Sequence, residues 1–432
     1  MGRTGQPAVP RRVTHHRRAS AEARPAVLRL DSDTVPSRRA GVRGRLIHGD
    51  NLGVMRALLP ELEGRIDLIY ADPPFNTGRA YPLRLGRGED SRRPDTWKQA
   101  PAYHDRWLGP DAYLDMLGPR LELMHRLLSA DGSLYLHLDW RSSARARILL
   151  DEIFGPDRLL NEIVWLYHGP SPIRSAFKRK HDTILVYTKS DRYVFNADAV
   201  RVPYDGATIK AFASSRRAGF GKRPRLARGK VPEDWWYFPV VARLHKERTG
   251  FPTQKPFALL DRIVRASSRR GGLVADFFCG SGTTASAAAA AGRRWLACDD
   301  SPAAIATAYR RLLLEQAGQR LQVWTTGDDL PLGGSPRLHW TQDGRNLEVA
   351  LASTSLGRAG VADDSEVNVW EVDWEARDLF VSRARAVRPW RSEDLERRLH
   401  HRYRRAGRYR VRVRAWDGRG RLHEQERAIQ VE

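Results

Sequence analysis

Residues 66–75 read IDLIYADPPF, an apolar run followed directly by an aspartate and two prolines. The run Ile66–Ala71 has the length and composition of a buried parallel strand. Because proline fixes φ and has no N–H group, Pro73 and Pro74 end the strand and form a stiff loop. Ligands of open α/β sheets bind beyond the carboxyl ends of the strands, so we expect this loop to border a site.

The loop offers the groups that an exocyclic amine on a flat base requires. The Asp72 carboxylate and the Pro73 carbonyl can accept the two amine hydrogens, and the Phe75 ring can stack on the base. A prolyl loop after a strand can equally be an ordinary turn. The rest of the sequence has to distinguish the two interpretations.

A second strand, turn and helix lie about two hundred positions further on. The buried run at residues 273–278 leads into Cys279-Gly280-Ser281-Gly282-Thr283 and an alanine-rich helix. Such glycines let the backbone approach a nucleotide closely, and Asp299 has the spacing of a ribose-binding carboxylate. NAD, FAD and S-adenosylmethionine all fit this pattern. The last is favoured, because Asp276 would repel phosphates but attract a methionine ammonium group.

The two segments together resemble the amino-group DNA methyltransferases, which form N6-methyladenine or N4-methylcytosine. Residues 72–78 are similar to the catalytic loop of these enzymes, and residues 253–256 and 276–284 are similar to their cofactor half. Because the catalytic loop comes first in the chain, the order resembles that of the beta group. This group includes the modification subunits of type III restriction systems. The resemblance covers residues 45–314.

This resemblance implies an α/β fold with a Rossmann-like, circularly permuted S-adenosylmethionine-dependent methyltransferase sheet. We expect the methyltransferase domain at residues 44–320, with a target-recognition or DNA-contact segment inserted at 168–250. Residues 81–102 lack periodicity and predict a flexible loop over the site. Residues 1–43 are expected to be a disordered basic arm. Alternating short runs within 321–432 predict a small, sandwich-like all-β domain.

The resemblance also implies a role for each matching residue, with no metal ion. The catalytic set is Asp72, Pro73, Pro74 and Phe75. The cofactor-binding set is Asp50, Lys255, Asp276, Phe277, Gly280, Ser281, Gly282, Thr283 and Asp299. Phe75 would stack on a base flipped out of the duplex; family members commonly carry tyrosine at this position.

Within the cofactor set, each charged side chain has its own expected partner. Asp276 would face the methionine ammonium group, and Lys255 could pair with the methionine carboxylate. Asp299 would bind the ribose hydroxyls and Asp50 the adenine of the cofactor. An alternative for Asp50 is a simple helix-capping role.

Composition indicates the partner. The chain has 432 residues with 74 Lys and Arg against 51 Asp and Glu, a formal charge of +23. This excess favours double-stranded DNA, although an arginine-rich coding bias would also produce it. A restriction subunit and a second copy of the chain are open as further partners. With two cysteines and no membrane-length apolar run, we expect a cytoplasmic protein without a membrane partner.

The predicted function is site-specific methylation of adenine N6 in double-stranded DNA through base flipping. Aspartate at position 72, rather than the serine typical of N4-cytosine enzymes, favours adenine. Two alternatives stay open: an N4-cytosine methyltransferase and a catalytically inactive DNA-binding specificity subunit.

Overall fold

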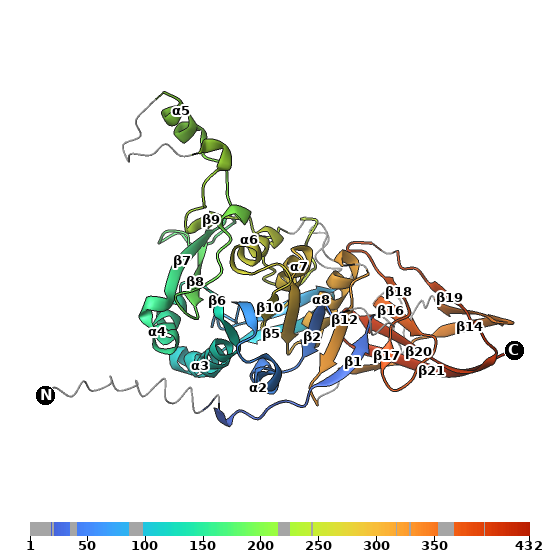
Figure 1. Cartoon of the computed structure of the whole chain (residues 1–432). Coiled ribbons are helices and arrows are strands. Elements are labelled where there is room, and N and C mark those ends of the chain that lie inside the picture. Colours follow the sequence, from blue (N-terminus) through green and yellow to red (C-terminus); the bar gives the residue numbers. More distant parts are fainter. Residues whose placement is uncertain are drawn as a thin grey trace.

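The computed structural model describes most of the chain, and its centre is an eleven-stranded mixed sheet (Figure 1). The described residues are 19, 21–34, 41–85, 98–214, 225–242, 245–316, 318–327, 330–352, 367–392 and 394–432. The strand order in the central sheet is β17-β1-β12-β2-β11-β10-β3-β6-β8-β7-β9. These strands are β1 (Arg29–Asp33), β2 (Gly44–His48), β3 (Ile66–Ala71), β6 (Leu128–Leu138), β7 (Leu159–Leu166), β8 (His181–Thr188), β9 (Trp235–Tyr237), β10 (Leu273–Asp276), β11 (Arg294–Asp299), β12 (Leu321–Thr325) and β17 (Phe380–Val381).

The predicted strands β3 and β10 are direct neighbours in this sheet. They run parallel, with Leu68 opposite Val274 and Tyr70 opposite Asp276. Their carboxyl ends therefore lie at the same edge, and the loops that follow them lie side by side. This placement brings together the two segments that carry the family resemblance.

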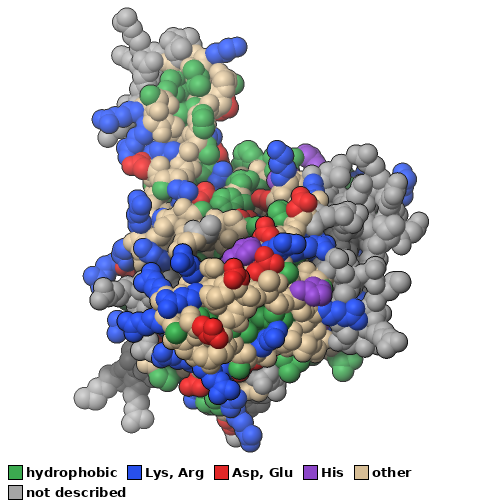
Figure 2. Space-filling view, turned by 90° about the vertical axis from the view of Figure 1, so that its right-hand side faces the viewer, with side chains coloured by type: hydrophobic (Ala, Val, Ile, Leu, Met, Phe, Trp, Pro, Cys, Tyr) green, Lys and Arg blue, Asp and Glu red, His purple; other side chains and the backbone are tan. Residues whose placement is uncertain are grey.

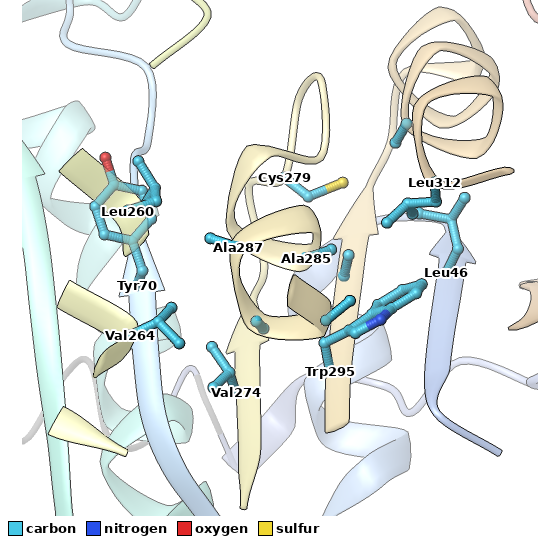
Figure 3. Packing of buried hydrophobic residues seen from close by; sticks show 14 of the residues in the cluster. Leu46, Tyr70, Leu260, Val264, Val274, Cys279, Ala285, Ala287, Trp295 and Leu312 are labelled. Carbon is cyan, nitrogen blue, oxygen red and sulfur yellow. The ribbon is translucent and has the colours of Figure 1, made fainter. Parts of the chain in front are cut away.

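Helices cover both faces of the sheet. One face packs against α2 (Asn51–Leu62), α3 (Gly109–Leu127) and α4 (Ser143–Phe154). The other packs against α6 (Phe257–Ser267), α7 (Thr283–Ala290) and α8 (Pro302–Glu315), whose small alanines approach the strands closely (Figure 3). Strand side chains alternate between the two faces, and β3 and β10 contribute side chains to the cores on both faces, so both strands are predominantly apolar.

The segment predicted to be a loop over the site is partly regular. Strands β4 (Arg79–Leu85) and β5 (Lys98–Asp105) form an antiparallel hairpin in which Tyr81 lies opposite Tyr103. The rings of these two tyrosines stack with centroids 5.0 Å apart. The two strands form a separate two-stranded sheet outside the central one. Residues 86–97, the middle of the expected loop, lie outside the described residues.

The predicted DNA-contact segment contains sheet strands and a projection. The α-helix α5 (Gly206–Ser214) in this segment stands away from the body of the molecule (Figures 1 and 2). In β9, Trp236 is buried, whereas Trp235 and Tyr237 are exposed, as expected for alternating side chains on an edge strand. The three aromatic side chains of β9 are thus divided between the core and the surface.

Two smaller sheets form the C-terminal part. The five-stranded sheet has the order β13-β21-β20-β16-β18, and the three-stranded sheet has the order β14-β15-β19. Their strands are β13 (Leu332–Gly334), β14 (Leu338–Asp343), β15 (Asn346–Leu351), β16 (Val367–Asp373), β18 (Ala384–Val387), β19 (Arg398–Arg402), β20 (Gly407–Asp417) and β21 (Leu422–Val431). They share a core built around Trp370, Trp374 and Tyr403. A buried hydrogen bond of 2.8 Å from Tyr309 to Glu371 joins them to α8.

The expectation of a disordered arm is wrong for Arg29–Asp33. This strand, β1, pairs antiparallel with β12 and parallel with β17, and so links the central sheet to the C-terminal part. The buried Asp33 carboxylate binds Arg320 at 2.7 Å and Gln322 at 3.0 Å. Such a strand depends on distant partners, and the short polar sequence gives no local signal for it.

Among the described residues, no helix is long and apolar enough to cross a membrane.

Candidate active site

A cavity of about 550 Å³ opens at the carboxyl ends of β3 and β10. Every predicted site residue except Gly282 lines it, so the catalytic loop and the glycine turn face a common space. Aromatic side chains of the β4–β5 hairpin, Tyr81 and Tyr103, complete the wall. No cluster of three or more metal-ligating side chains occurs among the described residues.

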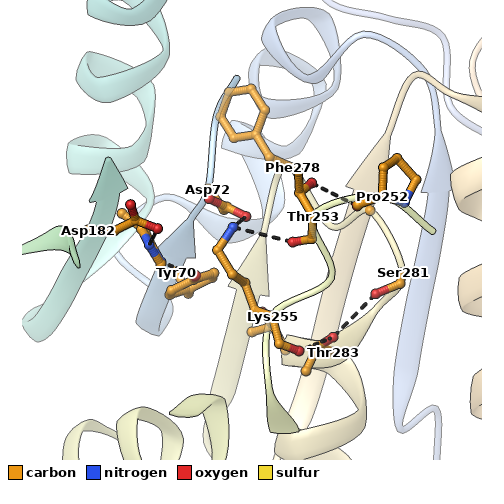
Figure 4. Close-up of polar contacts among 12 residues, drawn as sticks. Tyr70, Asp72, Asp182, Pro252, Thr253, Lys255, Phe278, Ser281 and Thr283 are labelled. Atoms are coloured by element: carbon orange, nitrogen blue, oxygen red, sulfur yellow. Dashed lines mark hydrogen bonds and ion pairs between the residues drawn. The ribbon is translucent and has the colours of Figure 1, made fainter. Parts of the chain in front are cut away.

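Lys255 contacts the catalytic loop directly. Its ammonium group forms an ion pair with the Asp72 carboxylate (Figure 4). The same ammonium group lies 5.2 Å from the centre of the Phe75 ring. Both charged side chains are largely buried, with 9% of Lys255 and 18% of Asp72 exposed. The partner of Lys255 in this structure is therefore Asp72, whereas the sequence suggested a cofactor carboxylate.

Phe75 rests on a buried histidine that the sequence reading did not select. The rings of Phe75 and His137 stack with centroids 5.9 Å apart and an interplanar angle of 27°. His137 Nδ1 is 2.7 Å from Tyr70 Oη, and its Nε2 is 3.3 Å from an Asp182 carboxylate oxygen. Burial disfavours the Asp182 charge, but hydrogen bonds from His137 and Tyr167 hold its pKa below the usual range. In the sequence, the feature that sets His137 apart is its position inside the apolar strand β6.

The far end of the catalytic loop is fixed by Asp105. This buried carboxylate accepts hydrogen bonds from the backbone N–H groups of Asn76 and Thr77, the latter at 3.0 Å. Asn76 has φ of 60°, a left-handed conformation in which asparagine is well tolerated. On the other side, Ser142 Oγ donates to the Phe75 carbonyl at 3.1 Å. The loop is thus held from both ends.

Asp276 lies at the base of the cofactor half. Its carboxylate accepts a hydrogen bond from the Phe278 N–H at 3.0 Å and another from Thr284 Oγ1 at 2.6 Å. Burial raises its pKa to about 7, although both hydrogen bonds oppose this shift. A carboxylate that is costly to keep charged in the free protein favours the arrival of a cationic group.

Asp299 holds the glycine turn. Its carboxylate accepts hydrogen bonds from the Gly280 N–H at 2.8 Å and the Ser301 N–H at 3.0 Å. Burial, and then the charge of Asp300, raise its pKa to about 7. Asp300 also lines the cavity and is more exposed than Asp299. The sequence does not distinguish this second carboxylate, because Asp299 and not Asp300 ends the strand.

Gly282 has a packing role instead of a place in the wall. It adopts φ of 73°, and an added Cβ would lie 2.9 Å from the Ala308 side chain. The turn therefore needs glycine so that α7 can approach α8. The neighbouring Gly280, with φ of 48°, does face the cavity.

Asp50 is both a cap and a wall residue. It accepts a hydrogen bond of 3.3 Å from the Gly53 N–H at the start of α2 and pairs with Arg120 at 2.8 Å. Arg120 also donates to Asn51, whose amide donates to the Phe277 carbonyl at 2.7 Å. This chain of contacts connects the end of β2 to the glycine turn. Asn51 and Arg120 were not selected from the sequence.

Comparison with known proteins identifies the family. The DNA methylase model of N6 and N4 methyltransferases matches residues 66–310, a span that contains both loops. The DNA adenine methyltransferase YhdJ of Escherichia coli K12 is 30% identical over 283 residues, covering 64% of this chain and 85% of that protein. The type II methyltransferase M.EcaI of Enterobacter cloacae is 26% identical over 399 residues, covering 78% and 85%. The M1.HpyAVI–SAM complex superposes with a TM-score of 0.40 at 18% identity, over 62% of this chain and 98% of that one. The chain therefore belongs to the DNA methylase family of N6- and N4-specific methyltransferases.

Proposed function

We propose that this S-adenosylmethionine-dependent DNA methyltransferase acts on the exocyclic N6 of adenine at specific sites in double-stranded DNA. The observation that carries the proposal is the adjacency of β3 and β10, which gives the Asp72 loop and the glycine turn one cavity. The target base must leave the helix to reach that cavity, because its amine is otherwise engaged in pairing. Incubation of purified chain with labelled cofactor and plasmid DNA, followed by identification of the modified nucleoside, tests this proposal.

Asp72 and the Pro73 carbonyl hold the amine in the proposed mechanism. The lone pair of an exocyclic amine is conjugated into its ring, which makes it a weak nucleophile. Two acceptors that draw its hydrogens toward tetrahedral geometry free the lone pair for attack. S-adenosylmethionine, when bound, supplies an electrophilic sulfonium methyl group. Asp72 can then accept the proton that the methylated amine loses, and no covalent enzyme intermediate is required.

The ion pair between Lys255 and Asp72 occupies the position proposed for the amine. Like the amine, an ammonium group donates hydrogen bonds to Asp72. We infer that Lys255 keeps the catalytic loop in order before the base enters and then shifts away from Asp72. The stacked Phe75 and His137 rings give the incoming base a rigid platform.

The cofactor roles follow from the lining of the cavity. Asp276 is proposed to bind the methionine ammonium group beside Phe277 and Ser281. Thr283 Oγ1 donates to the Lys255 carbonyl at 3.3 Å, so its role is to join the two segments of the cofactor half, residues 253–256 and 276–284. Asp299, with Asp300 next to it, is proposed for the ribose hydroxyls and Asp50 for the cofactor adenine.

Adenine is favoured over cytosine by the carboxylate at position 72 and by the adenine-specific name of the E. coli relative. N4-cytosine methylation is the second candidate, because the same two acceptors could hold either amine. An inactive specificity subunit is disfavoured by the complete set of acceptors around the cavity. A cytoplasmic location, a cognate restriction subunit and a homodimer belong to the proposal as well, by analogy with restriction–modification systems.

Replacement of Lys255 by methionine separates its two candidate roles. Because its ammonium group faces Asp72, we expect kcat to fall about 10- to 100-fold, while the cofactor Kd changes by less than about threefold. Single-turnover kinetics and calorimetric titration with S-adenosylmethionine measure the two quantities. The reverse result, a weakened Kd with kcat preserved, would assign Lys255 to the methionine carboxylate.

Cofactor affinity is expected to depend on pH through Asp276. Its pKa of about 7 in the free protein means that the carboxyl group is protonated, and unable to attract an ammonium group, in acidic solution. The affinity for S-adenosylmethionine is therefore highest above pH 7, where Asp276 is ionised, and it falls as the pH drops below 7. The Kd should rise about tenfold between pH 8 and pH 6. The Asp276→Asn variant should bind weakly and depend less on pH, with the remaining dependence coming from Asp299, whose pKa is also raised to about 7. A flat profile for the unmodified chain would refute the role of Asp276.

A further inference from the structure

We infer that the loop between β7 and β8, residues 167–180, is a DNA wedge whose Phe177 enters the base stack when the target base is extruded. The inference rests on the proposed function and names the part of the chain that opens the duplex. Extruding a base leaves a gap in the stack, and proteins that distort DNA commonly fill such gaps with an apolar side chain. Phe177 has the chemistry and the exposure for this task.

The strand directions place the wedge loop at the edge of the sheet that holds the active site. β6 runs parallel to β3, and β8 runs antiparallel to β6, with Leu138 opposite Thr183. β8 therefore begins where β3 and β6 end. β7 pairs antiparallel with β8, with Leu166 opposite His181, so the loop joins the two strands at this same edge.

Side-chain contacts tie the loop to the platform under Phe75. At its base, Tyr167 Oη donates to Asp182 at 3.1 Å, and Asp182 is bound to His137. Near its end, the Arg179 guanidinium lies 4.2 Å from the centre of the Trp140 ring. Trp140 is two residues from Ser142, which binds the Phe75 carbonyl. The loop is thus connected to the base-binding ring on both sides.

Phe177 is presented to solvent by a supported loop. Its side chain is 98% exposed, the second highest value among the large hydrophobic side chains with notable exposure in the described part of the chain. Elsewhere the loop is held together: Lys180 Nζ donates to the Pro170 carbonyl at 2.8 Å, and the Tyr167 N–H donates to the Lys180 carbonyl at 3.1 Å. An aromatic side chain of this size loses favourable burial when it stays in water. Stacking between bases would provide that burial.

The charge around Phe177 fits a duplex. Residues 167–180 contain Arg174, Lys178, Arg179 and Lys180 and no Asp or Glu. By contrast, the face that carries the C-terminal sheets mixes charges of both signs (Figure 2). Cations on both sides of an exposed ring can contact phosphates on both sides of an opened base step.

The test compares Phe177→Ala with Phe195→Ala, since Phe195 is also exposed, at 41%, but follows the other end of β8 at the opposite edge of the sheet. The substrate is a short duplex carrying the sequence modified in DNA of an expressing host. On this duplex, Phe177→Ala should lower kcat/KM about tenfold or more, and Phe195→Ala should leave it unchanged. Opposite an abasic position the target base is already unpaired, so the Phe177→Ala defect should shrink to about threefold or less. Phe177→Trp should restore activity on the paired duplex.

Equal kcat/KM for Phe177→Ala and the unmodified chain on the paired duplex would overturn the wedge, as would a defect of equal size on the abasic duplex. Cofactor binding by each variant, measured by calorimetry, shows whether the site is intact. If the unmodified chain binds cofactor but methylates no DNA, the proposed function fails. The wedge surface is then judged by binding of a fluorescent duplex, where Arg174→Gln with Lys178→Gln should weaken affinity and Arg192→Gln should not; equal affinities refute it.

Discussion

Replacing Asp72 by asparagine should abolish methyl transfer while cofactor binding stays near normal. Asparagine keeps one of the two carboxylate oxygens as an acceptor but replaces the other with an amide donor. It also cannot take up a proton from the amine. Loss of one oriented hydrogen-bond partner of a reacting group costs about a hundred- to a thousandfold in rate. Asp72 both holds the amine and accepts its proton. We expect kcat to fall about a thousandfold or more, measured by single-turnover methylation of plasmid DNA.

The partner of Asp72 requires a control. Lys255 is largely buried, so the single substitution leaves an ammonium group without its carboxylate and can lower the melting temperature. The double variant Asp72→Asn with Lys255→Met removes both charges. It should recover stability but stay inactive. Turnover within about tenfold of the unmodified chain, in either variant, would contradict the role given to Asp72.

The substitution Gly280→Val should abolish cofactor binding. Gly280 has φ of 48°, which β-branched residues avoid, and an added Cβ would lie 3.1 Å from the Phe251 ring. Its N–H also donates to Asp299, so a shifted backbone would release the carboxylate proposed for the ribose. The side chain would project where the backbone must approach the ligand. We expect the Kd for S-adenosylmethionine, measured by calorimetry, to rise about a hundredfold or more.

Gly271 provides a matched control for this effect. It has φ of 78°, but nothing lies within 4 Å of an added Cβ. Gly271→Val therefore imposes the same kind of backbone strain, about 1–2 kcal/mol, without filling the cavity. It should lower the melting temperature and leave the Kd unchanged. Equal loss of affinity in the two variants would show that the glycine turn acts through stability alone.

The sequence predicted the parts of the fold that local pattern determines. The runs at Ile66–Ala71 and Leu273–Asp276 are strands because short, predominantly apolar runs suit a position buried on both faces. Their adjacency followed from the family resemblance, since no local signal in either strand specifies its neighbour. The alanine-rich helix was equally clear, because only small side chains allow α7 to lie so close to the sheet.

Features that depend on distant partners could not be read in this way. β1 has only five residues, and its order comes from β12, β17 and the ion pair between Asp33 and Arg320. The β4–β5 hairpin is likewise defined by mutual pairing. In the site, the carboxylates at the ends of the strands could be predicted from the sequence. The partner of Lys255 could not, because 183 positions separate it from Asp72. His137 was missed for the same reason: its significance lies in the Phe75 ring above it.

Nucleoside mass spectrometry of duplex DNA, after incubation with the purified chain and S-adenosylmethionine carrying an isotopically labelled methyl group, tests the account most directly. Label in N6-methyldeoxyadenosine is the predicted result, and the Asp72→Asn variant should yield none. Label in N4-methyldeoxycytidine would overturn the choice of base but keep the shared cavity. No labelled nucleoside, from a chain that binds both cofactor and DNA, would contradict the claim that the two loops act together on one amine.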